Sequence, residues 1–583
     1  MTASSSGRNE FLITASERYR YSDIIATMQM LAHNFDERGI LPGERILICA
    51  RNDYAISATF LAAVFHGLVP INLSPDVKAD RATAILRETA PKLLVAEKDI
   101  SNDWGMSCDV LHVSSIRPTS FFGGKTAKRW PFDGKPPKCG NLKLPSDMGA
   151  LAYLLFTSGS TASPSGVMLS RVNLLANITT VGDVLQISAG DRQFVDLPMA
   201  HTDGLINGPV LAFCRQATVV RAGMYSQSNM ENWLNVVRQE RCTHFMTVPY
   251  VWKMICRFAE HDDYFDGPEM EMLISSAGRI TPKLWSEIER RFSKPVVNEY
   301  GMTETVMAAL HAGKFDKMGP PGSLGKSNHC ETKINPLDAS DSNTGELLLR
   351  GHNICLGYWN DPTRTADSFD DDGWFGTGDI VTFRADGSFD LVGRSKTMIN
   401  SAGMTISPDE IDEALVSHPH VENALTVGIS DPDFGEISVS GVELAQHITS
   451  IQLLELLRRK LKLRKVPKHI FALSKILRGM SGKPEIASTR EILKEMLHAN
   501  QNKVKSCGKA DVQSRILAVA AQTFASDIDD ISLGSGPDDI AGWDSFSHIN
   551  FIFALEDEFS QHFPAKKVMG IQRLEDVVAL IDG

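Results

Sequence analysis

Short apolar runs alternate with helical patterns over roughly the first 330 residues, and this alternation limits the fold more than any other feature of the sequence. Residues 46–50 and 69–72 read as buried strands, and apolar residues recur at helical spacing over residues 21–36. Residues 52–67 predict a second helix that ends near a glycine. Such alternation is typical of layered α/β folds. Because 583 residues are too many for one hydrophobic core, we expect several domains.

Composition excludes several classes of protein. The chain is 43% hydrophobic and 22% charged, as in ordinary globular proteins. Its net charge of -12 argues against a nucleic-acid partner, which usually requires a basic face. An apolar run of about 18 residues is needed to span a membrane, and no run in the sequence reaches that length. Residues 1–10 are polar, so we expect no signal peptide. The nine cysteines show no metal-ligand spacing, so we expect reduced thiols and a cytoplasmic location.

The stretch from Thr157 to Val167 is the first candidate binding element. It reads Thr-Ser-Gly-Ser-Thr-Ala-Ser-Pro-Ser-Gly-Val and follows residues 151–156, an apolar run that predicts a buried strand. Its hydroxyl residues, glycines and proline are unsuited to a core or a helix. Backbone N–H groups and hydroxyls in such a loop suit a phosphate chain. A surface turn is the alternative that this stretch alone leaves open.

Further motifs follow this loop in a fixed order. They are residues 298–304 (NEYGMTE), 345–351 (GELLLRG), 373–379 (GWFGTGD), 393–396 (GRSK) and 481–483 (SGK). The series resembles the adenylate-forming superfamily, which includes acyl-CoA synthetases, luciferases and the adenylation domains of peptide synthetases. The resemblance implies ATP-dependent activation of a carboxylic acid as an acyl-AMP.

The resemblance also implies a division into domains. Residues 1–394 would form a large, multi-layered α/β adenylation core, and residues 395–496 a small, mobile α+β subdomain that carries the catalytic lysine. Residues 497–508 have the polar composition of a flexible linker. Residues 509–583 would form an all-α carrier helix bundle.

A nucleotide site follows from the same resemblance. Tyr300 would stack on adenine, Asp379 would accept the ribose hydroxyls, and Arg394 would contact ribose or phosphate. Thr303 would contact the α-phosphate, and Glu304 would bind Mg²⁺, which prefers oxygen ligands. Lys483 would be the catalytic lysine and Lys396 the hinge of the small subdomain. The remaining nucleotide contacts implied are Thr157, Ser158, Gly159, Ser160, Thr161, Gly166, Ser276, Ala277, Gly278, Asn298, Glu299 and Gly301.

The segment around His201 would line the acid pocket, together with Gly278 and with Gly403 at the approach of the thiol. Domains that activate α-amino acids place an aspartate one residue after an aromatic, whereas here Thr202 follows His201. A buried ammonium without a carboxylate partner is costly, so we expect an acid without an α-amino group. Asp203 could still serve a differently placed amine. His201 would act in catalysis, and a hydrogen-bonded core histidine is the alternative.

Two loop positions depart from the family pattern. Ala162 stands where glycine is usual, and Ser165 where lysine is usual. An alanine with positive φ would be strained by about 1 kcal/mol or more, and the serine removes a cation near the phosphates. Weaker ATP binding is therefore expected.

The acidic C-terminal piece resembles an acyl or peptidyl carrier protein. Residues 509–583 contain five Lys and Arg against 13 Asp and Glu, with helical patterns at 512–524 and 546–559. Gly542-Trp543-Asp544-Ser545-Phe546 resembles the Asp-Ser motif of carriers, which implies a covalent 4′-phosphopantetheine on Ser545. A helix N-cap is the alternative for this serine.

We interpret the chain as a ligase that uses ATP and Mg²⁺ to load a carboxylic acid onto its own carrier, for a nonribosomal peptide or polyketide assembly line. This interpretation implies a phosphopantetheinyl transferase and a downstream acyl-accepting enzyme or synthase as partners. An acyl-CoA ligase that releases soluble acyl-CoA, an amino-acid-activating adenylation–carrier didomain and a scaffold that no longer adenylates remain as alternatives.

Overall fold

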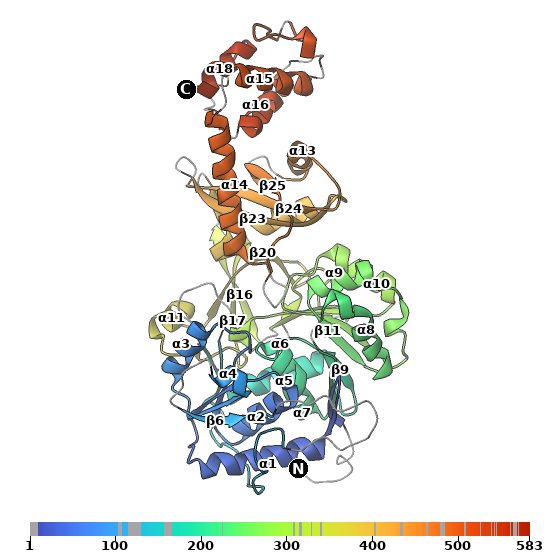
Figure 1. Ribbon diagram of the computed structural model, residues 1–583, viewed down its shortest axis with the longest axis vertical. Helices are drawn as coiled ribbons and strands as arrows, with labels where there is room; N and C mark the ends of the chain where they lie inside the picture. The colour runs from blue at the N-terminus through green and yellow to red at the C-terminus, as the bar shows by residue number, and fades with distance from the viewer. Residues whose placement is uncertain are drawn as a thin grey trace. The chain divides into compact units, whose positions relative to one another are not determined.

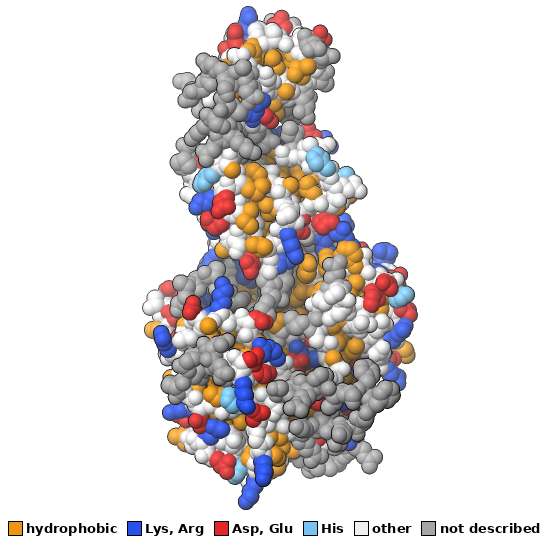
Figure 2. Space-filling model, viewed as in Figure 1, with side chains coloured by type: hydrophobic (Ala, Val, Ile, Leu, Met, Phe, Trp, Pro, Cys, Tyr) orange, Lys and Arg blue, Asp and Glu red, His pale blue; other side chains and the backbone are white. Residues whose placement is uncertain are grey.

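The computed structural model describes most of the chain in two compact units, Met1–Leu391 and Val392–Gly583. The described residues are 10–102, 108–114, 130–156, 166–306 without 224, 309–313, 318–338 without 328, 341–431 without 402–403, 435–478 without 462–464, and 484–582 without 507–508, 525, 527, 538, 541–542, 544, 560, 562, 564–567 and 569–570. Each unit is an independent layered structure (Figure 1). Figure 2 shows acidic and basic side chains mixed over the visible face of the first unit.

A seven-stranded sheet, as far as the chain is described, arises from the predicted alternation in the first unit. Its strand order is β18-β8-β7-β4-β3-β5-β6. The four strands β4, β3, β5 and β6 pair in parallel, and β7 and β8 form an antiparallel pair. Their bounds are β3 Arg45–Cys49, β4 Val69–Asn72, β5 Leu93–Ala96, β6 Asp109–His112, β7 Leu151–Phe156, β8 Gly166–Ser170 and β18 Gly357–Tyr358.

A second, nine-stranded sheet within the described residues of this unit has the order β15-β14-β13-β12-β11-β9-β10-β1-β2. In this order, neighbouring strands from β13 to β1 pair in parallel, and β14 pairs antiparallel with β13. The bounds are β1 Glu10–Thr14, β2 Arg18–Arg20, β9 Arg192–Val195, β10 Thr218–Arg221, β11 His244–Thr247, β12 Met272–Ser275, β13 Val296–Tyr300, β14 Leu310–Gly313 and β15 Lys326–Ser327.

Helices pack against these sheets through large apolar side chains. Trp233 of α8, Trp252 of α9 and Trp285 of α10 belong to one buried cluster with Phe245 of β11, and these elements lie together in Figure 1. Asn52 caps α2, because its side chain accepts a hydrogen bond from the backbone of Ala55. The helices are α1 Tyr21–Glu37, α2 Asp53–Phe65, α3 Ala79–Thr89, α4 Lys98–Asn102, α5 Arg171–Val184, α8 Met230–Gln239, α9 Pro249–Phe258, α10 Pro282–Phe292 and α11 Pro362–Ser368.

The apolar stretch after His201 is broken rather than one continuous helix. The sequence predicted a helix over residues 205–213, and the structure has α6 Thr202–Leu205, a π-helical turn Ile206–Val210 and α7 Leu211–Arg215. Pro209 lies inside the π-helical turn. Proline lacks the N–H that an α-helix requires, so the helix widens locally at this residue.

A four-stranded sheet follows, in the order β16-β17-β19-β20, with β16 Glu331–Asp338, β17 Asp341–Arg350, β19 Phe375–Phe383 and β20 Phe389–Arg394. Asp379 lies inside β19 and is 1% exposed. Next to Asp379 the pairing of β19 with β17 shifts register, and Gly378 has φ of 71°, in the left-handed region that glycine adopts readily.

The second unit begins with a small α+β layer. Its strand order is β22-β21-β24-β23, with β25 paired to β24. One buried cluster includes residues of α12 and α13, and another includes Leu493 and Leu497 of α14. The elements are β21 Ile399–Ser401, β22 Met404–Ile406, β23 Val421–Asp431, β24 Gly435–Leu444, β25 His469–Ala472, α12 Pro408–Val416, α13 Ser450–Lys460 and α14 Ile486–Ser506.

Residues 497–506, predicted as flexible linker, are helical because α14 continues to Ser506. Alanine, glutamine and lysine in this segment are good helix formers, and residues 497–507 contain no glycine. Polar composition alone was therefore a poor guide here.

The C-terminal residues form helices around a core of their own. The helices α15 Lys509–Phe524, α16 Ser545–Phe559 and α18 Leu574–Asp582 cover the two patterns predicted from the sequence. Ile516, Phe551 and Leu574 are fully buried in this core. None of the helices in the described part of the chain is both long and apolar enough to cross a membrane.

Candidate active site

Three of the predicted binding segments of the first unit follow parallel strands of the nine-stranded sheet. His201 lies in the segment that follows β9, Ser276 directly follows β12, and Tyr300 is the last residue of β13. Carboxyl ends of parallel strands meet at one edge, where open α/β sheets bind ligands. Segments far apart in the sequence are therefore brought together at this edge.

Tyr300 and Asp379, predicted to contact adenine and ribose, are joined by a hydrogen bond. The Tyr300 hydroxyl donates to Oδ2 of Asp379 at 2.6 Å, and both side chains are buried. The backbone N–H of Asp379 donates to Oγ1 of Thr377 at 3.1 Å. The carboxylate is thus held against the aromatic ring.

Glu304 lies next to β8, the strand that follows the predicted phosphate loop. It belongs to a 3-10 turn, Thr303–Thr305, directly after β13, and it is half-buried. The hydroxyl of Tyr358 donates to Oε1 of Glu304 at 2.9 Å. Tyr358 pairs with Val167 across β18 and β8, and the N–H of Trp359 donates to the carbonyl of Gly166 at 2.7 Å. The predicted Mg²⁺ ligand, Glu304, is therefore linked through Tyr358 to β8.

Tyr358 was not predicted as a site residue. Burial, and then the charge of Glu304, raise the pKa of Tyr358 well above its usual range, so the hydroxyl stays a donor. The guanidinium of Arg364 lies 3.8 Å from the centre of its ring. A lone tyrosine carries no spacing signal in the sequence, and only the pairing of β18 with β8 reveals its position.

Asp203 and Ser276, assigned from sequence to the acid pocket and the adenine edge, are in contact. The Ser276 hydroxyl donates to Oδ1 of Asp203 at 2.7 Å. Asp203 lies in the first turn of α6, which packs tightly on the preceding loop: a Cβ on Gly204 would be 2.3 Å from the carbonyl oxygen of Pro198. His201 precedes α6 and is half-buried, and Thr202 is buried.

Glu299 has a fully buried side chain on the neighbouring strand. Asn207 donates to its Oε2 at 3.3 Å, and Nε2 of His311 lies 3.6 Å from its Oε1. Burial raises the pKa of Glu299, while His311 acts in the opposite direction and the charge of Asp203 adds to the rise. Asn298, its neighbour in β13, is buried as well.

The turn after β12 contains backbone strain. Ala277 has φ of 63°, in the left-handed region that alanine rarely adopts. Gly278, next to it, is exposed, and a Cβ there would lie 3.3 Å from Pro249. Strained residues of this kind gather at ligand-binding turns.

A buried ion cluster, which the sequence did not reveal, supports the segment that leads to His201. The Arg221 guanidinium donates to the carbonyls of Val195 and Leu197 at 2.7 and 3.0 Å and pairs with Asp53 at 2.8 Å. The indole of Trp233 donates to Asp196 at 2.7 Å. Burial raises the pKa of Asp196 to about 7, although Arg221 acts in the opposite direction.

Other predicted residues belong to the second unit or fall outside the described residues. Arg394 and Lys396 belong to the second unit, where they are exposed. Ser545 is the first residue of α16. The roles of these three residues stay predictions, as do those that fall outside the described residues: Thr157, Ser158, Gly159, Ser160, Thr161, Ala162, Ser165, Gly403 and Lys483.

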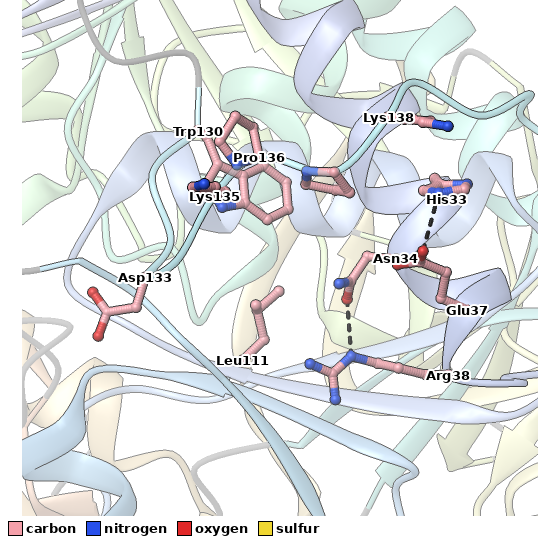
Figure 3. Close-up of a pocket in the computed structure, with 11 residues that line it drawn as sticks. His33, Asn34, Glu37, Arg38, Leu111, Trp130, Asp133, Lys135, Pro136 and Lys138 are labelled. Atoms are coloured by element: carbon pink, nitrogen blue, oxygen red, sulfur yellow. Dashed lines mark hydrogen bonds and ion pairs between the residues drawn. The ribbon is translucent and has the colours of Figure 1, made fainter.

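A separate surface hollow of about 630 Å³ lies between α1 and residues 130–138 (Figure 3). His33 pairs with Glu37 at 3.2 Å on its α1 side, and Arg38 donates to Asn34 at 3.0 Å. The described residues that line the hollow include none that the sequence motifs single out.

Known proteins resemble this chain over most of its length. A family model described as AMP-binding enzyme matches residues 2–359. An oxalate–CoA ligase of Arabidopsis thaliana is 28% identical over 77% of this chain and 88% of its own length. An indoleacetate–CoA ligase of Aromatoleum aromaticum is 31% identical over 58% and 67%. The crystal structure of ATP-bound MatB from Rhodopseudomonas palustris has the same fold, with a TM-score of 0.74 at 22% identity over 85% of this chain and 97% of that chain.

Proposed function

Because the chain belongs to the AMP-binding enzyme family and is an ATP-dependent acid–thiol ligase, we propose that it converts a carboxylic acid to an acyl-AMP and then to a thioester at the carboxyl edge of the nine-stranded sheet. The observation that carries this proposal is the meeting of Tyr300 with Asp379 and of Glu304 with Tyr358. These contacts join three segments of the chain: the motif at residues 298–304, the motif at residues 373–379, and β18.

In the first step a carboxylate oxygen of the acid attacks the α-phosphorus of ATP, and the bond to pyrophosphate breaks. Tyr300 would stack on the adenine, Asp379 would accept the ribose hydroxyls, and Thr303 would contact the α-phosphate. Lys483 and the loop from Thr157 to Gly166 would face the charge that develops on phosphate oxygens. In the second step a thiol attacks the acyl carbonyl and AMP leaves.

Glu304 fits a magnesium ion. Tyr358 donates to Oε1, and Oε2 accepts no hydrogen bond from the described residues, which leaves a hard oxygen ligand for a divalent cation. When bound, the ion would balance the negative charge between this carboxylate and the phosphates. Tyr358 orients the carboxylate for that purpose.

The names of the relatives support free coenzyme A as the thiol acceptor. Oxalate–CoA, sulfoacetate–CoA and indoleacetate–CoA ligases all carry CoA in their names. The sequence interpretation placed the carrier first, and the relatives reverse that order. We therefore take an acyl-CoA ligase as the first candidate.

Transfer to a fused carrier is the second candidate. The helices α15, α16 and α18 have a core of their own, and Ser545 begins α16 directly after the predicted Asp-Ser motif. A phosphopantetheine on Ser545 would then supply the thiol. This candidate keeps the predicted division into a core (1–394), a subdomain (395–496) and a carrier (509–583). The subdomain would turn about Lys396, and the thiol would approach past Gly403.

The test measures activation and transfer separately. Acid-dependent exchange of pyrophosphate with ATP reports acyl-AMP formation. Mass spectrometry then reports acyl-CoA in solution and acyl-pantetheine on the intact protein, after treatment with a phosphopantetheinyl transferase. Acyl-CoA formed equally by wild type and Ser545→Ala supports the first candidate, and a mass gain on the wild type alone supports the second. Absence of exchange with every acid in a broad panel would contradict both.

A further inference from the structure

Asp203 keeps an unused hydrogen-bond acceptor at the edge where the acid would bind. Ser276 has one hydroxyl proton and donates it to Oδ1 of Asp203 at 2.7 Å. A carboxylate can accept about four hydrogen bonds, and within the described part of the chain Oδ2 accepts none. The side chain is half-buried, so the remaining acceptor faces partly shielded space.

Ser276 also fixes where this acceptor lies. Ser276 is fully buried, and its backbone N–H donates to the carbonyl of Thr247 at 3.1 Å. The neighbouring Ala277 has positive φ, and Gly204 leaves α6 no space to move toward Pro198. The carboxylate is therefore held in place before a ligand arrives, which lowers the entropic cost of binding.

The charge of this region is unfavourable for a second anion. Glu299 is buried on the adjacent strand, close enough for the charge of Asp203 to act on it. His311 contacts Glu299 on its far side from Asn207, and His201 precedes the helix that carries Asp203. A ligand next to α6 therefore contacts the negatively charged acceptor of Asp203. This acceptor favours a hydrogen-bond donor on the ligand and repels a carboxylate or sulfonate.

We propose that Asp203 determines specificity, and that the acid activated by this chain carries a hydrogen-bond donor, a hydroxyl or an amine, and no second anionic group. This inference rests on the proposed function, because it assumes that the acid binds beside α6. It also separates the chain from two relatives, which are named for acids with two anionic groups, oxalate and sulfoacetate. The donor would make a charge-assisted hydrogen bond with Oδ2 of Asp203.

Matched acids on two scaffolds test this inference by ATP–pyrophosphate exchange. The aryl set is 4-hydroxybenzoate, 4-aminobenzoate, benzoate and terephthalate, and the aliphatic set is 6-hydroxyhexanoate, 6-aminohexanoate, hexanoate and adipate. On the better scaffold we expect kcat/KM for a donor acid to exceed that of the plain parent by about tenfold or more, as for a hydrogen bond to a charged group. The diacid should be the poorest substrate, and the two donor arms separate a hydroxyl from an amine.

Asp203→Asn keeps the shape of the side chain and removes its charge. In this variant the ratio of donor acid to parent acid should fall about tenfold, and the ratio of diacid to parent acid should rise. Asp183→Asn is the matched control, because Asp183 lies in α5 and pairs with Arg215 at 2.7 Å, outside the site. The inference would be overturned if a diacid or a plain acid supported exchange as fast as the donor acids and if Asp203→Asn did not change this order of rates. The proposed function would remain intact in that case. Failure of every acid would instead contradict the proposed function, and this inference with it.

Discussion

Replacing Tyr358 with phenylalanine removes a single hydroxyl group, the one that donates to Oε1 of Glu304 at 2.9 Å. Phenylalanine keeps the buried ring, so its packing and the stacking of Arg364 at 3.8 Å are retained. The substitution therefore isolates the hydrogen bond that orients the proposed Mg²⁺ ligand.

The expected size of the effect follows from the charge of Glu304 and the burial of Tyr358, which is 5% exposed. A hydrogen bond to a charged group contributes about 1.5–3 kcal/mol. If the bond holds Glu304 in its productive position, its loss should lower kcat/KM for Mg–ATP by about 10- to 150-fold. The Mg²⁺ concentration needed for half-maximal rate should rise in parallel.

Pyrophosphate exchange over a range of Mg²⁺ concentrations measures both quantities. Tyr54→Phe is the matched control: Tyr54 is fully buried in α2 and its hydroxyl is hydrogen-bonded to Thr27 at 2.8 Å. The control reports the cost of losing a buried tyrosine hydroxyl elsewhere in the same unit. A change below about twofold in Tyr358→Phe, with an unaltered Mg²⁺ requirement, would refute the positioning role.

Three further predictions concern buried carboxylates and their partners. Asp379→Asn should lower kcat/KM for ATP by about tenfold or more, because Tyr300 and the ribose lose a charged acceptor; steady-state kinetics at saturating acid measure this, and an unchanged value would contradict the ribose role. Burial raises the pKa of Asp412 to about 8, although Thr426 donates to it at 2.6 Å. Its contribution to stability is therefore complete below about pH 4 and is lost as the pH rises from there through about 8. Urea unfolding from pH 5 to 9 should show this loss in the wild type and not in Asp412→Asn, and parallel pH profiles would refute it. Arg221→Met should destabilise the first unit by about 3–5 kcal/mol, since it leaves buried carboxylates without their cation; a melting temperature equal to wild type would exclude this.

Local periodicity was enough to place many elements of the first unit. The strands Val69–Asn72 and Leu151–Phe156 and the helix Tyr21–Glu37 occur where the sequence predicts them, because each buries a pattern that its own residues define. The motif order also identified the family, which the match of the family model over residues 2–359 confirms. Each of these strands, helices and motifs is recognised from residues that lie close together in the chain.

Local reasoning failed where a backbone detail or a distant partner decides the conformation. Pro209 breaks the helix expected over residues 205–213, and α14 extends through a segment whose polarity suggested a linker. In each case the missing information was a hydrogen bond made or lost by the backbone.

The chemistry of the site divides in the same way. The residue types and their order are readable in the sequence: an aromatic and an aspartate predicted for the nucleotide, a glutamate predicted for a cation, and a histidine and an aspartate predicted near the acid. The contacts of Tyr300 with Asp379, of Tyr358 with Glu304 and of Ser276 with Asp203 emerge only in the folded chain. These pairs are separated by 79, 54 and 73 residues along the chain. Tyr300 and Ser276 lie where parallel strands of the nine-stranded sheet end, whereas Asp379 comes from β19 of the four-stranded sheet and Tyr358 from β18 of the seven-stranded sheet. No local pattern encodes this meeting of three sheets.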